Sequence, residues 1–123
     1  MIGWCIVIAQ QTPAERAASV DKKAAILAKW DSSPGGIGWI ESLVREGKAT
    51  QLAHGGYPNR YAALAGDVLP RIADGPPDHS GPPVIGESYV MSGNWAGTAQ
   101  IDRAKIAACP SEQVLTIEVW DLG

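Results

Sequence analysis

The residue types of a hydrolase active site occur together at one point of the chain. Asp78, His79 and Ser80 supply an acid, a base and a hydroxyl nucleophile. Consecutive residues cannot form a catalytic triad, because its three groups must converge from different elements of the fold. The sequence also lacks the nucleophile-elbow, phosphate-loop and zinc-protease motifs of common enzyme classes. We therefore expect a polar loop at this segment and a protein that is not an enzyme.

Residue types that ligate metals are sparse and poorly spaced. The cysteines, Cys5 and Cys109, and the histidines, His54 and His79, do not have the spacing of a zinc site. Cys5 lies in an apolar run, where a free thiol behaves as a small hydrophobic group. We expect neither a metal nor a cofactor.

Tryptophans and acidic residues indicate a surface that binds a protein. The chain has five tryptophans and no phenylalanine, and tryptophan is enriched where proteins bind one another. Seven basic and five acidic residues give residues 1–62 a net charge of +2, whereas three basic and eight acidic residues give residues 63–123 a net charge of −5. An acidic surface fits a basic partner. The predicted partner-binding residues are Tyr57, Arg60, Asp74, Asp78 and Trp95.

A helix followed by a hairpin suggests a different function. Residues 37–46 have helical periodicity, and short strands at 48–53 and 60–64 flank a turn that is rich in glycine. The segment resembles the recognition helix and wing of winged-helix DNA-binding domains. The resemblance implies that Arg45, Lys48 and Arg60 contact phosphates.

A third possibility is a small-ligand protein that sequesters a signalling nucleotide. Tyr57, Arg60, Tyr61 and Tyr89 offer aromatic surfaces and a positive charge for such a ligand. This hypothesis requires that the fold bring them together in a pocket.

The elements that would position these residues form a single α+β domain over residues 1–123. At 46% hydrophobic and 19% charged residues, the composition is that of a folded chain rather than a disordered or membrane protein. A capping box at Thr12 and Glu15 predicts a long amphipathic helix that runs to about Trp30. Strands are predicted at 3–9, 84–91, 95–102 and 114–120, and a helical turn is predicted at 66–72. A helix over about 98–108 is the alternative to the strand at 95–102. The terminal strands are expected side by side in a mostly antiparallel sheet, with Leu115, Ile117 and Val119 facing the core.

The chain as a whole resembles small proteins of tailed phages and prophages. The segments that carry the resemblance are residues 55–61, 69–72, 101–108 and 117–121. Proteins of this size and origin are often inhibitors of host machinery, including anti-CRISPR and other anti-defence proteins. By that analogy, the resemblance implies an inhibitor that binds a host protein or protein complex.

The expected location is the cytoplasm of a bacterial host, because the apolar start of the chain lacks the basic flank of a signal peptide. We expect no membrane partner, and nucleic acid only under the winged-helix alternative. The chain is expected to be a monomer or a small homo-oligomer.

Overall fold

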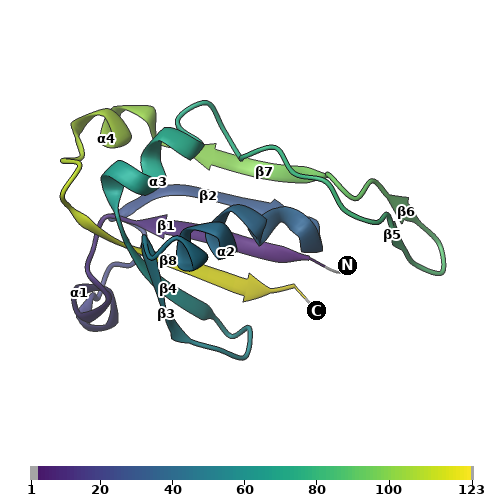
Figure 1. Cartoon of the computed structure of the whole chain (residues 1–123), viewed down its shortest axis with the longest axis horizontal. Coiled ribbons are helices and arrows are strands. Elements are labelled where there is room, and N and C mark those ends of the chain that lie inside the picture. Colours follow the sequence, from purple (N-terminus) through teal and green to yellow (C-terminus); the bar gives the residue numbers. More distant parts are fainter. Residues whose placement is uncertain (1–2, 123) are drawn as a thin grey trace.

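The computed structural model describes residues 3–122, which form a six-stranded sheet, a separate two-stranded hairpin and four α-helices (Figure 1). The sheet has the order β3-β4-β8-β1-β2-β7, and all of its strand pairs are antiparallel. Its strands are β1 (Trp4–Ala9), β2 (Ile26–Ser32), β3 (Ala49–Ala53), β4 (Asn59–Leu64), β7 (Ala96–Ile101) and β8 (Val114–Asp121). The helices are α1 (Pro13–Ala18), α2 (Gly38–Arg45), α3 (Ala65–Ile72) and α4 (Arg103–Ala108). The predicted α+β class is confirmed.

The two terminal strands lie side by side in the middle of the sheet, as predicted. Ile6 pairs with Val119 and Ile8 pairs with Ile117 in the β1–β8 register. These four side chains are fully buried on one face, because successive residues of a strand point to opposite faces. The apolar alternation of β8 therefore predicted its core-facing side correctly.

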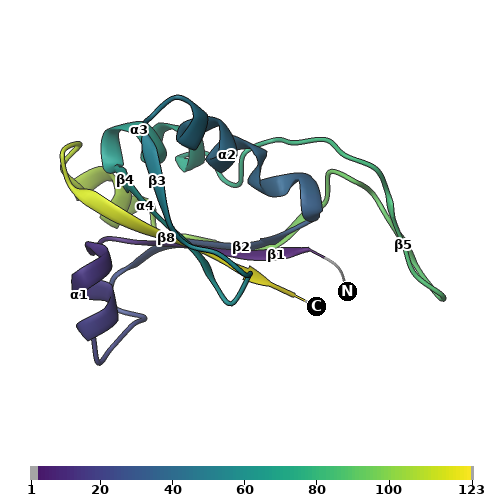
Figure 2. The ribbon, with the colours of Figure 1, turned by 60° about the horizontal axis from the view of Figure 1, so that its bottom comes forward.

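Helices α2 and α3 cover that buried face, while α1 lies on the opposite side of the sheet (Figure 2). Ile40 and Leu43 of α2 and Val68 and Ile72 of α3 pack into the core. Trp30 of β2 stacks on Trp39 of α2, with ring centroids 6.2 Å apart. The face opposite α2 and α3 is called the open face below.

The predicted long helix over residues 12–30 is wrong. The capping box is present, since Thr12 Oγ1 accepts from the Glu15 amide and the Glu15 carboxylate accepts from the Thr12 amide. The helix ends after one and a half turns, and Val20, which the helical spacing placed in the core, is 102% exposed. Residues 26–32 instead form β2, because pairing with β1 and β7 satisfies their backbone on both sides.

The wing-like module is not confirmed either. The helix α2 and the strands β3 and β4 are present, but β4 pairs along its whole length with β8. The hairpin is therefore the edge of the main sheet rather than a free wing. Its turn uses Gly55 and Gly56 at φ of +102° and +85°, a backbone conformation that favours glycine.

The predicted strand at 84–91 is two short strands, β5 (Val84–Ile85) and β6 (Val90–Met91), that pair with each other. This hairpin, called the arm below (residues 84–91), projects well beyond the sheet (Figures 1 and 2). The loop 74–83 leads into it, and the turn 92–95 leads back to β7.

Candidate functional site

The five predicted partner-binding residues lie in separate places. Tyr57 is exposed at the tip of the β3–β4 hairpin, and Arg60 lies on the open face. Asp74 and Asp78 are exposed in the loop between α3 and the arm. Trp95 stands at the start of β7, partly buried, where its carbonyl accepts from the Ser33 amide. Only the last three are close to the arm along the chain.

The residues of the winged-helix alternative do not share a surface. Arg45 ends α2, on the helix-covered side of the sheet, and donates to Ser42. Lys48 follows α2 and lies 3.9 Å from the Glu46 carboxylate. Arg60 lies on the open face.

The residues of the nucleotide alternative are separated in the same way. Tyr61 is buried in the core, whereas Tyr89 is on the arm and Tyr57 is at the hairpin tip. The pocket that this hypothesis requires is therefore not formed by these residues within one chain.

A pair formed by the buried Ser33 and the partly buried His79, which sequence reasoning missed, holds the base of the arm. Ser33 Oγ donates to the Gly93 carbonyl at 2.7 Å and lies 2.5 Å from His79 Nε2. A hydroxyl has one proton, so both contacts are satisfied when Nε2 carries a proton and donates it to Ser33. A nucleophilic serine needs the opposite polarity, with the imidazole as acceptor. The geometry is that of a clamp between the loop 74–83 and the turn 92–95.

A polar row crosses the open face from β4 to β7. The register aligns Arg60 with Glu118, Glu118 with Val7, Val7 with Lys29, and Lys29 with Gln100. In this row Glu118 and Val7 lie in the middle, with one cation on each side of them: Arg60 on β4 and Lys29 on β2. Trp120 lies two residues beyond Glu118 in β8, opposite Cys5, and is 39% exposed.

Helix α1 adds a buried arginine to this row. The Arg16 guanidinium lies 3.2 Å from the Glu118 carboxylate, and the exposed fractions of the two side chains are only 5% and 7%. Arg16 also donates to the Lys22 carbonyl and to the Gln11 side chain. Arg60 lies 4.0 Å from the same carboxylate. Glu118 is thus shared between two guanidinium groups, which leaves an excess of positive charge.

Two adjacent hollows follow the open face and its β7 edge. The smaller, of about 280 Å³, is lined by Val7, Arg16, Ala17, Lys22, Ile26, Lys29, Arg60, Glu118 and Trp120. The larger, of about 720 Å³, is lined by Lys23, Ile26, Leu27, Lys29, Gln100, Ile101, Asp102, Arg103 and Lys105. The two hollows adjoin at Ile26 and Lys29, which line both, and together they are called the basic groove below.

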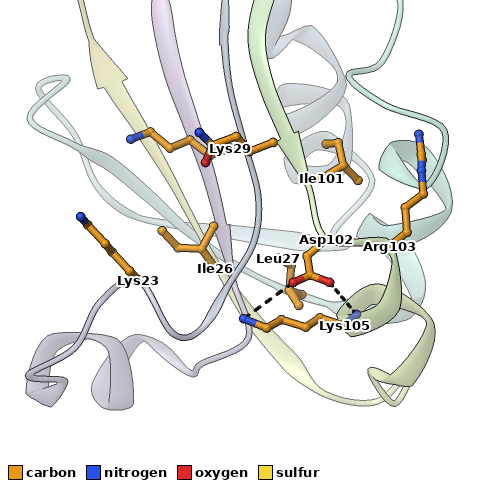
Figure 3. A pocket seen from close by; sticks show the side chains of 9 residues that line it. Lys23, Ile26, Leu27, Lys29, Ile101, Asp102, Arg103 and Lys105 are labelled. Atoms are coloured by element: carbon orange, nitrogen blue, oxygen red, sulfur yellow. Dashed lines mark hydrogen bonds and ion pairs between the residues drawn. The ribbon is translucent and has the colours of Figure 1, made fainter.

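The basic groove concentrates the positive charge of an acidic protein. Its lining includes seven of the ten lysines and arginines but only two carboxylates, Asp102 and Glu118. Asp21 and Asp31, which flank it along the chain, raise the number of carboxylates to four. The ammonium groups of Lys23, Lys29 and Lys105 are spread around the larger hollow, whereas Arg103 points away from them (Figure 3).

The thiol on the open face is not poised for chemistry. Burial raises the pKa of Cys5, and the carboxylate of Asp31 raises it further. A thiol with a raised pKa stays protonated at neutral pH and is a poor nucleophile. Cys5 is therefore not activated as a nucleophile.

Only Arg60 of the groove was among the predicted site residues. Arg16, Lys22, Lys23 and Lys29 belong to the segment that periodicity assigned to one helix, which would have scattered them around its surface. The available signal was the alternation of β8, which places Glu118 and Trp120 together opposite the core.

Among residues 3–122, no three His, Cys, Asp or Glu side chains are grouped so that they could hold a metal ion. In the same range, no helix is long and apolar enough to cross a bilayer. Comparison with known proteins finds no matching protein family, no matching curated protein and no matching solved structure.

Proposed function

We propose that this protein is a non-enzymatic binding protein that docks onto another protein through the arm and blocks it. The observation that carries the proposal is the exposure of apolar side chains on the arm. Ile85 is 71% exposed and Val90 is 72% exposed. The arm that carries them stands clear of the sheet (Figure 2). Covering such side chains in an interface is favourable, at about 25 cal/mol per Å² of apolar surface.

The arm is also held in one shape before it meets a partner. At its tip, the Gly86 amide donates to the Tyr89 carbonyl at 2.8 Å, and the Tyr89 ring packs against Gly86. At its base, the Ser33–His79 pair holds both connecting segments, and Gly93 packs so closely on Gly81 that a Cβ there would collide. A preorganised binding element loses less conformational entropy when it binds.

The partner is a host protein complex, such as one that defends bacteria against phages, and binding inhibits it. The resemblance to small phage proteins supports this part of the proposal. The acidic residues Asp74 and Asp78, which precede the arm, favour a partner with a basic surface.

A tagged pull-down from bacterial lysate, with and without nuclease, tests the proposal. Wild-type protein is expected to retain a stoichiometric partner that resists nuclease. The double variant Ile85→Ser with Val90→Ser should lose this partner without a change in melting temperature, because both side chains are already exposed. The matched control, Val20→Ser with Leu52→Ser, changes exposed apolar residues elsewhere and should retain it.

The acidic contribution is tested in the same assay. Asp74→Lys with Asp78→Lys should weaken capture of the partner, with melting unchanged. Retention of the partner by both double variants would contradict docking through this part of the molecule.

A further inference from the structure

The basic groove follows the open face of the sheet and its β7 edge. Its cations lie on both sides of Lys29. Lys23 and Lys105 line the larger hollow, and Lys22 and Arg60 line the smaller one. Figure 3 shows that the ammonium groups around the larger hollow do not converge on one point. This spacing suits a chain of negative charges rather than a single small anion.

An arginine that lines the smaller hollow is held rigidly by its surroundings and keeps one buried donor without a partner. Three buried side-chain donors among the described residues have no hydrogen-bond partner, and of these Arg16 Nε belongs to the groove. A buried donor without a partner is unfavourable. The terminal nitrogens of the same guanidinium donate to the Gln11 side chain, the Lys22 carbonyl and the Glu118 carboxylate, so Arg16 adds a fixed positive charge to the lining of the hollow.

An aromatic side chain lies beside these cations. Trp120 lines the smaller hollow and is partly exposed, on a strand whose neighbours hold it in place. Single-stranded nucleic acids bind by combining a positively charged groove with aromatic rings on which bases stack. The bases of a duplex are already stacked, so a duplex cannot use this ring in the same way.

From these observations we infer that the basic groove binds a single-stranded nucleic acid. The phosphates lie along the lysines on either side of Lys29, and one base stacks on Trp120. The remaining surface, with three cations and nine carboxylates outside the groove and its flanks, repels the same ligand and confines it to the groove. This activity is independent of docking through the arm, since no arm residue lines the groove.

Fluorescence anisotropy with labelled oligo(dT) and oligo(U), across a series of salt concentrations, tests the inference on the whole chain. Binding is expected at low salt, and the logarithm of the association constant should fall linearly with the logarithm of salt concentration. A duplex probe of the same length should bind more weakly. Absence of any complex at low salt would overturn the inference.

Three variants locate the site. Lys29→Glu should weaken binding roughly tenfold or more at low salt and should flatten the salt dependence, because it removes a phosphate contact. Trp120→Ala should weaken binding by roughly tenfold but leave the salt dependence unchanged, because stacking is not ionic. The control Lys48→Glu makes the same change in net charge outside the groove and should alter affinity by less than about twofold.

Two outcomes would assign the groove differently. Equal losses in Lys29→Glu and Lys48→Glu would mean that net charge rather than the groove attracts the probe. Competition by polyglutamate as strong as by unlabelled oligonucleotide would point to an acidic protein segment. If Lys29→Glu does not fold, Lys23→Glu, in the exposed turn before β2, replaces it. The arm variants of the pull-down should bind the oligonucleotides normally, so the two proposals can fail separately.

Discussion

The two faces of the central sheet are built from the same strands and show opposite chemistry. Ile117 and Glu118 are neighbours in β8, and both are almost completely buried. Ile117 faces α2 and α3 within an apolar core, whereas Glu118 faces α1 and lies between two guanidinium groups. Burial alone therefore does not distinguish the two faces. What distinguishes them is whether the buried atoms need polar partners.

The comparison also explains how an acidic protein presents a basic surface. The core under α2 and α3 consists of hydrophobic side chains. The open face collects cations from α1, β2 and β4 and from the turn before β2. Net charge describes the average field at long range, but a ligand in the groove meets the local excess of cations.

The largest effect on stability is expected on the helix-covered face. Ile117→Ala should lower the free energy of unfolding by about 4 kcal/mol, because it removes a fully buried side chain and leaves a cavity between two sheet strands and the helices. Urea denaturation followed by circular dichroism measures the change. Val20→Ala, an apolar truncation at an exposed position, serves as control and should change stability by less than about 0.5 kcal/mol.

A smaller but more diagnostic effect is expected on the open face. Glu118→Gln should lower the free energy of unfolding by about 3 kcal/mol, because it leaves the buried Arg16 guanidinium without a countercharge. Urea denaturation again measures the change.

The double variant Arg16→Met with Glu118→Met distinguishes the loss of the ion pair from the burial of an unpaired charge. It removes both charges, so it should be less destabilised than Glu118→Gln, and neutral or stabilising replacement is common for such pairs. A double variant that is less stable than the single one would mean that the open face depends on this ion pair for its fold.

The helix-covered face could be predicted from the sequence because its signal is local. The alternation of Leu115, Ile117 and Val119 identified the core side of β8, and the apolar run at the start of the chain identified β1. The prediction of one helix over residues 12–30 was wrong because Ala17, Val20 and Ala24 have helical spacing by coincidence. Pairing of β2 with two neighbouring strands outweighed that local preference, as tertiary context often does.

The basic groove could not be predicted because it is assembled by register between strands that are far apart in the sequence. Arg16 and Glu118 are separated by 102 positions and meet only when β8 lies beside β1 and α1 packs on the open face. From residue types alone, only Arg60 could be predicted as a site residue. Predicting the other residues of the groove requires knowing which face of each strand lies on the side of α1.

The smallest of the three losses of stability is expected at the N-terminal cap of α1, the helix that carries Arg16. Thr12→Ala removes the side-chain acceptor of the Glu15 amide and should cost about 1 kcal/mol of stability at neutral pH. The measurement is the same urea titration. A loss as large as that of Glu118→Gln would mean that the cap contributes as much as the ion pair to stability.

Because Glu15 is part of the same cap, the stability that the cap contributes depends on pH. Hydrogen bonds from the Thr12 amide and side chain lower the pKa of Glu15 from its ordinary value of 4.5. A carboxyl group with a lower pKa in the folded state stabilises the fold above its unfolded pKa, and this contribution disappears as the pH falls through the folded pKa. Wild-type protein should therefore melt above Glu15→Gln at neutral pH, and the difference should shrink below pH 4.5. A difference that persists in acid would mean that the effect of Glu15→Gln does not come from the ionised carboxylate of the cap.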